Sequence, residues 1–132
     1  MDKTVVELWL GLCDRDLKGA HGLLKTKNYV LAGYQCHQVM EKALKAYIAS
    51  VSDGDDPPRI HNLPKLAEWK GLGAELSDEQ KKLINDLNPL FIEARYADYK
   101  SAILSLMTPE RCKQLITQTE EFLSWTKRRL SK

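Results

Sequence analysis

The chain has 132 residues, of which 43% are hydrophobic, so it is long enough to bury one core and too short for two ordinary domains. Twenty basic and eighteen acidic residues leave a formal net charge of +2, which excludes the strong positive field that drives non-specific nucleic-acid binding. Seven glycines and five prolines are too few for a disordered or low-complexity protein. We therefore expect a single domain over residues 1–132.

The three cysteines, Cys13, Cys36 and Cys112, lie far apart among apolar residues, which favours neither a disulfide framework nor a zinc site. The opening stretch "MDKTVVELWLGLCDRD" contains acidic residues and no long apolar run, so no signal peptide is expected. No segment approaches the roughly 20 apolar residues of a membrane span. These features predict a cytoplasmic protein that has no membrane partner, metal or cofactor.

Two long helices are expected first, because apolar residues recur every three or four positions over residues 5–24 and again after Asn28, a candidate cap. The second helix ends at "SDGDDPPR", where glycine and the paired prolines cannot continue it. Its expected inner face is Gly33, Cys36, Met40, Leu44, Tyr47, Ile48 and Val51. Four polar residues are expected to its side or outside: Gln38, Glu41, Lys42 and Lys45.

Three further helices follow in the pattern. Asn62 is a candidate cap for a short helix over residues 63–70, and "SDEQ" at residues 77–80 is typical of a capping box. The helix after that box should bend near Pro89, and "TPER" opens the last helix with Thr108 as its cap. Without a competing strand pattern, the sequence predicts an all-α, up-and-down antiparallel four-helix bundle with one additional short helix.

Four separated segments resemble the HEPN domain family: "WLGLCDRDLKGA", "GYQCHQVMEKALKAYIA", "IHNL" and "LNPLFIEARYADYK". Together they cover nearly the whole chain from Trp9 to the last helix. The resemblance implies a helical bundle that commonly forms a homodimer. It also implies one of three roles: an RNA-cutting toxin, a nucleotide-binding module, or the partner of a minimal nucleotidyltransferase in a two-gene system.

Ribonucleases of this family are similar to one another in an Arg-x(4–6)-His motif, where Arg holds a phosphate and His is a general acid or base. No histidine follows Arg95, and Arg59 is separated from His61 by only one residue. Arg15 and His21 have the right spacing, but they lie in the first helix, whereas the motif belongs to later helices. The sequence therefore favours a protein that is not an enzyme.

Two acidic residues are candidates for structural roles. Asp16 falls on the apolar stripe of the first helix, where a carboxylate needs a partner, and the guanidinium of Arg95 is the expected one. Alternatively, Arg95 stays partly free for a phosphate. Glu41 and Lys45 are four residues apart in the order that favours a helix-surface ion pair.

A ligand pocket is the other possibility for this part of the chain. Lys45, His61, Arg95 and Tyr96 are the ligand-binding candidates, because they offer cations, an imidazole and a ring for stacking. The main hypothesis is a non-catalytic HEPN protein that binds a nucleotide, an RNA or a nucleotidyltransferase partner within a toxin–antitoxin or defence pair. The alternatives are a metal-independent ribonuclease with a variant site around Arg95 and His61, and a purely structural homodimer.

Overall fold

The computed structural model describes residues 3–52, 56–91 and 105–131, and every described element is helical. The predicted all-α bundle is confirmed. In chain order the elements are α1 (Lys3–Lys25), α2 (Tyr29–Val51), α3 (Leu63–Glu68), the 3-10 helix η1 (Trp69–Glu75), α4 (Asp78–Leu87), the 3-10 helix η2 (Asn88–Leu90) and α6 (Pro109–Leu130).

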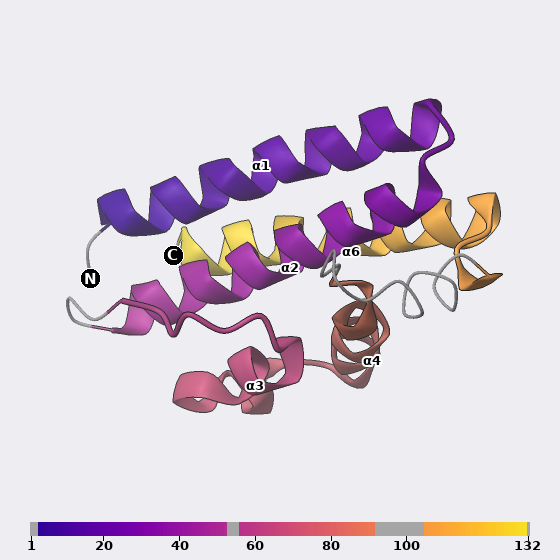
Figure 1. Ribbon diagram of the computed structural model, residues 1–132. Coiled ribbons are helices and arrows are strands. Elements are labelled where there is room, and N and C mark those ends of the chain that lie inside the picture. The colour runs from indigo at the N-terminus through magenta and orange to yellow at the C-terminus, as the bar shows by residue number, and fades with distance from the viewer. Residues whose placement is uncertain (1–2, 53–55, 92–104, 132) are drawn as a thin grey trace.

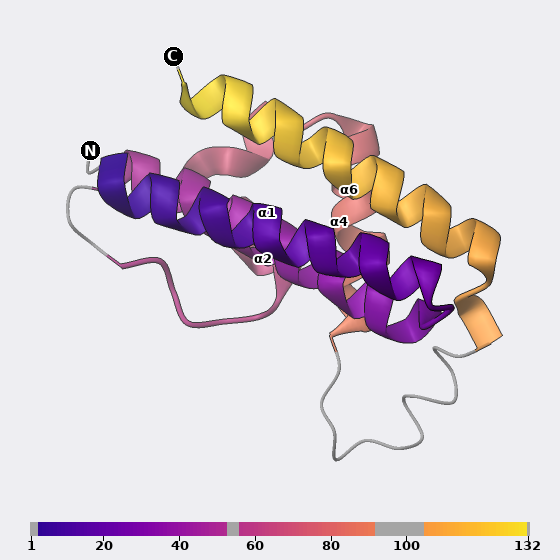
Figure 2. The same ribbon diagram turned by 90° about the horizontal axis from the view of Figure 1, so that it is seen from above.

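The long helix α2 lies at the centre of the arrangement. It runs antiparallel to α1, with α3 and α4 on the side of α2 that faces away from α1 (Figure 1). The view from above shows α6 along the flank of the α1–α2 pair (Figure 2). The fourth helix of the bundle, α4, is only ten residues long and crosses beneath the long helices (Figure 1).

Three of the predicted helix starts have the expected cap. The side chains of Asn62, Ser77 and Thr108 each accept a hydrogen bond from a backbone N–H three residues further on, at 3.0, 3.1 and 3.1 Å. At Ser77 the capping box is complete, since the side-chain oxygen of Gln80 accepts the Ser77 N–H at 2.9 Å. These bonds satisfy donors that the first turn of a helix leaves free.

The start of α2 differs from its predicted form. Asn28 does precede the helix, but its side chain makes no cap bond. Its amide instead donates to Thr26 Oγ1 at 2.8 Å, within a turn where Lys27 has φ of 62°. The Asn28 side-chain nitrogen thus bonds back to the turn between α1 and α2, while the side-chain oxygen, which is the capping atom, accepts no N–H of the first turn of α2.

Two helix ends also lie elsewhere than expected. The short helix α3 stops at Glu68, and the chain continues through η1, where Lys70 and Gly71 have positive φ values of 54° and 77°. The helix expected to bend near Pro89 ends at Leu87, and η2 follows it. Proline lacks the N–H that a continuing α-helix needs, so the break replaces a bend.

Helix α2 is surrounded by protein on several sides. Fourteen of its residues are buried, far more than one face of a helix provides. Glu41 and Lys45 are among them, at 4% and 6% exposure, so their predicted place at the side or outside of the helix is wrong. Val51, assigned to the inner face, is 48% exposed.

Gly33 is a point where other segments approach α2 closely. A Cβ atom at this position would lie 2.8 Å from Met107 Cε and 3.3 Å from Leu90 Cδ1. The missing side chain thus lets the segment before α6 and the turn η2 pack directly on the start of α2. No described helix is both long enough and apolar enough to cross a membrane.

Candidate functional site

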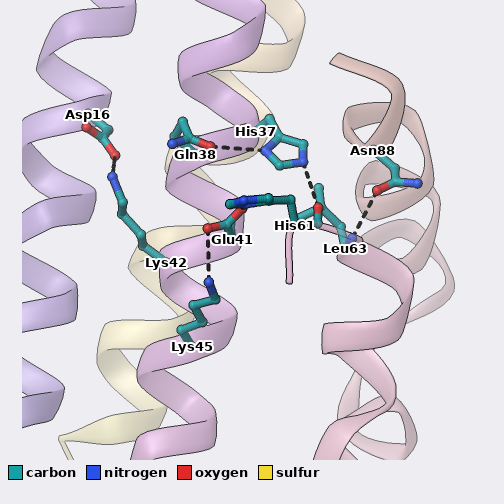
Figure 3. A network of polar contacts seen from close by, with 9 residues as sticks. All are labelled: Asp16, His37, Gln38, Glu41, Lys42, Lys45, His61, Leu63 and Asn88. Carbon is teal, nitrogen blue, oxygen red and sulfur yellow. Dashed lines mark hydrogen bonds and ion pairs between the residues drawn. The ribbon is translucent and has the colours of Figure 1, made fainter. Parts of the chain in front are cut away.

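A buried carboxylate in the middle of α2 organises the candidate site, which consists of Glu41, Lys45, His61 and Phe91 and is called the His61 site below. Glu41 Oε1 lies 2.8 Å from His61 Nδ1, and Glu41 Oε2 accepts a hydrogen bond from Lys45 Nζ at 3.1 Å (Figure 3). Each carboxylate oxygen therefore has a partner. These two bonds offset the cost of removing a charged group from water.

The Glu41 contact fixes the proton position on the exposed imidazole. A carboxylate can only accept hydrogen bonds, so His61 Nδ1 carries the hydrogen. Its other ring nitrogen, Nε2, has no hydrogen bond to any described residue, and the side chain is 54% exposed. The site thus contains one oriented imidazole ring that is about half exposed.

Three contacts hold His61 and the chain next to it in place. The ring stacks on Phe91, with centroids 4.4 Å apart and planes at 15°. The backbone carbonyl of His61 lies 3.1 Å from His37 Nε2 on α2. Just beyond, the Leu63 N–H donates to Asn88 Oδ1 at 2.9 Å, which ties the start of α3 to η2 (Figure 3).

His37 is fully buried and holds the segment that contains His61 through its contact with the His61 carbonyl. Burial lowers its pKa, because a charged imidazole is disfavoured away from water, and this outweighs the opposing effects of Glu41 and of the hydrogen bonds. The neutral ring donates from Nε2 to the carbonyl of His61. His37 therefore positions the His61 backbone, whereas Glu41 positions its ring.

The lowered pKa of His37 predicts that acid destabilises the fold. In the unfolded chain the imidazole takes up a proton near its ordinary pKa of 6.5, but the folded state binds it only at lower pH. The penalty is absent above pH 6.5 and grows as the pH falls towards the folded pKa. Urea unfolding followed by circular dichroism should show stability declining between pH 7 and 5, and less steeply in His37→Gln, which keeps a donor for the carbonyl. Equal slopes in both proteins would contradict this account.

Lys45, a ligand-binding candidate, lies in the interior. Its side chain is 8% exposed, and Nζ, which bonds to Glu41, also lies 5.8 Å from the centre of the Trp9 ring. An ammonium in this position is stabilised by both the carboxylate and the indole face. In the described structure Lys45 supports Glu41 and does not present its charge to solvent.

Asp16 is paired with Lys42 of α2, and the two side chains are 18% and 19% exposed (Figure 3). This contact joins α1 to α2 beside the His61 site. The expected partner of Asp16, Arg95, lies outside the described residues, as does Tyr96. Their predicted roles remain predictions.

The Asp16–Lys42 pair should contribute to stability because it is largely shielded from water. Lys42→Met is expected to cost about 1–2 kcal/mol, between the values for exposed and for buried ion pairs. Lys82→Met, which removes the 74% exposed partner of Asp86, is the control and should cost less than about 1 kcal/mol. Adding Asp16→Asn to Lys42→Met should recover part of the loss in chemical denaturation. Strictly additive losses would show that the pair is not coupled.

His37 and Phe91 were not predicted to belong to this site. A signal for the first was present, since His37, Glu41 and Lys45 are spaced by four residues and so lie along one line of α2. Phe91 gave no such signal, because its stacking on His61 joins segments thirty residues apart.

The cysteines do not add reactive groups to the site. Cys13 and Cys36 are buried, and burial raises the pKa of each thiol to about 12, so neither is a thiolate at neutral pH. Within the described ranges, no group of three or more histidine, cysteine, aspartate or glutamate residues is arranged to hold a metal ion.

A solved protein structure has a similar helical architecture. The crystal structure of TT1696 from Thermus thermophilus is similar to this chain with a TM-score of 0.78. The match covers 93% of this chain and 96% of that one at 19% identity, which supports a shared fold. No curated protein matches the sequence significantly. The HEPN domain family matches residues 6–130, and the chain belongs to this family.

Proposed function

We propose that this chain is a cytoplasmic, non-catalytic HEPN domain protein that binds a nucleotide or an RNA element at the His61 site. One observation carries the proposal: a half-exposed imidazole is held by a buried carboxylate and stacked on an aromatic ring. Such a ring is pre-organised, so a ligand would not have to fix its rotamer. A non-catalytic role is favoured because the expected Arg-x(4–6)-His motif is absent from the later part of the sequence.

The free nitrogen of His61 suits a phosphate. When the imidazole is protonated, Nε2–H is a charged donor directed away from Glu41, and charge-assisted bonds to phosphate are among the stronger hydrogen bonds. Phe91 is only partly buried and can add stacking with a base. The anion contact is local, which agrees with a net charge of only +2.

Binding to labelled single-stranded RNA and to ATP, followed by fluorescence anisotropy and calorimetry, tests the proposal. His61→Ala should weaken binding about tenfold, the effect of losing roughly 1.4 kcal/mol in a charge-assisted contact. His21→Ala is the matched control, because His21 is a partly exposed histidine on α1 that pairs with Glu120. Equal affinities of the parent and His61→Ala proteins would refute the proposal.

A metal-independent ribonuclease is the second candidate, favoured by the Glu41–His61 contact. A carboxylate on Nδ1 leaves Nε2 free, which is how an imidazole is oriented for general-base chemistry. The parent protein would then cleave RNA in the presence of EDTA, and His61→Ala would abolish cleavage. RNA that is bound but left intact by the parent protein would support the binding module instead.

We also propose a homodimer, with a minimal nucleotidyltransferase as a further partner in a toxin–antitoxin or defence pair. Family membership supports both, since the resemblance implies common dimerisation and such gene pairs. Light scattering at micromolar concentration should give the mass of two chains. A mass of one chain would refute the homodimer.

A further inference from the structure

A cavity lies between α4 and α6, and none of its lining residues belongs to the His61 site. It has a volume of about 440 Å³, within the range of small-molecule pockets. It lies between the first turns of α4 and the second half of α6, which contact each other. The residues that matter below are Glu75, Glu79, Gln118, Glu121, Phe122 and Trp125, and we call this cavity the α4–α6 groove.

The α4–α6 groove is acidic although the whole chain is slightly basic. Three of its lining residues are glutamates and none is basic. Glu79 and Glu121 are exposed and have no hydrogen-bond or ion-pair partner among the described residues. The positive end of the α4 dipole, which would oppose a cation, is offset by the carboxylates of Asp78 and Glu79 in the first turn. The groove therefore repels phosphate and attracts a cation.

A buried acceptor in the groove also lacks a donor. Gln118 Oε1 is shielded from solvent and has no hydrogen-bond partner among the described residues. Buried polar atoms of folded proteins are normally paired, so an unpaired one in the wall of a cavity needs an explanation. Rotation of the partly buried Gln118 side chain towards the groove would let the N–H groups of a ligand supply the missing donor.

The chain itself shows which cation this surface accepts. The guanidinium of Arg129 pairs with Glu75, and its central carbon lies 6.0 Å from the centre of the Trp125 ring. Glu75 also accepts a hydrogen bond from Tyr47. A carboxylate and an indole face are a suitable pair for a planar guanidinium, which makes forked hydrogen bonds and stacks on aromatic rings.

We propose that the α4–α6 groove binds an alkylguanidinium group, the side chain of arginine. Glu79 and Glu121 would balance its charge, Gln118 Oε1 would accept one of its N–H groups, and the aromatic side chains would cover its alkyl part. The volume of the groove exceeds that of one guanidinium, which leaves room for the adjoining backbone of a peptide. This inference is independent of nucleotide binding.

Calorimetry on the full chain with three probes tests the chemistry. The probes are an acetylated and amidated Gly-Arg-Gly peptide, the same peptide with citrulline, and n-propylguanidinium, which carries a single charge. Citrulline has nearly the shape of arginine without its charge, so its peptide should bind at least about tenfold more weakly. Binding of n-propylguanidinium as tight as that of the arginine peptide would identify a small guanidinium as sufficient, and peptide binding alone would identify a polypeptide source. Equal binding of the arginine and citrulline peptides would overturn the proposal.

Substitutions of residues in the α4–α6 groove test whether the arginine peptide binds there. Glu79→Gln and Glu121→Gln should each weaken arginine-peptide binding about two- to fivefold, as expected for partly exposed charge pairs. Glu110→Gln, an exposed change in the first turn of α6 outside the groove, should leave affinity unchanged. Arg129→Gln should tighten binding, because it frees Glu75 and Trp125, and misfolding cannot cause a gain. Unchanged affinity in the Glu79→Gln/Glu121→Gln double variant would overturn the assignment.

Discussion

Replacing Glu41 with glutamine is expected to lower the free energy of unfolding by about 3–5 kcal/mol, the usual effect of breaking a buried ion pair from one side. The change is nearly isosteric, so it leaves no cavity. It does leave the Lys45 ammonium, whose side chain is 8% exposed, without an opposite charge. It also removes the charged acceptor of His61 Nδ1. Urea titration followed by the helical signal in circular dichroism measures the loss.

A double variant tests whether the loss of stability comes from the unpaired charge of Lys45. Glu41→Leu combined with Lys45→Met replaces the ion pair with apolar side chains and should recover most of the loss, because no buried charge is stranded. Glu110→Gln, an exposed change on α6, is the control and should alter stability by less than about 0.5 kcal/mol. Equal stabilities of Glu41→Gln and Glu110→Gln would show that the pair contributes nothing.

Local chemistry explains why the helix starts could be predicted from the sequence. At Asn62, Ser77 and Thr108 the side chain and the N–H that it accepts are three residues apart, so the sequence contains both partners. Asn28 shows where this reasoning fails. Its side-chain nitrogen donates to Thr26, and its side-chain oxygen makes no cap bond, an outcome that depends on the geometry of the connecting turn.

Burial around α2 could not be predicted from periodicity. A pattern of 3.6 residues identifies one apolar face, but it does not show that α1, α3, α4 and α6 together cover nearly the whole circumference. Glu41 and Lys45 therefore look like a surface pair in the sequence and are an interior pair in the fold. Their burial results from contacts between segments that are far apart in the sequence.

In the candidate site, too, a local contact could be predicted from the sequence and the long-range contacts could not. The (i, i+4) spacing of Glu41 and Lys45 was sufficient to predict their contact. The contact of Glu41 with His61 spans twenty residues and depends on the path of the chain before α3. Phe91 joins the site only because η2 lies against that loop, as the Leu63–Asn88 hydrogen bond shows.

Leu44 lies on the central helix α2. It is 1% exposed and belongs to the main hydrophobic core. Leu44→Ala is expected to cost about 2–5 kcal/mol, because it removes apolar contacts and leaves a cavity that tightly packed helices cannot fully close. Leu31→Ala is the matched control on the same helix. Leu31 is 48% exposed, so the same deletion should cost less than about 1 kcal/mol there. Both losses come from midpoints of urea titrations, provided that the slopes agree between the variants. Similar losses for the two variants would mean that α2 does not lie at the centre of the core. The burial of Glu41 and Lys45 would then be unexplained.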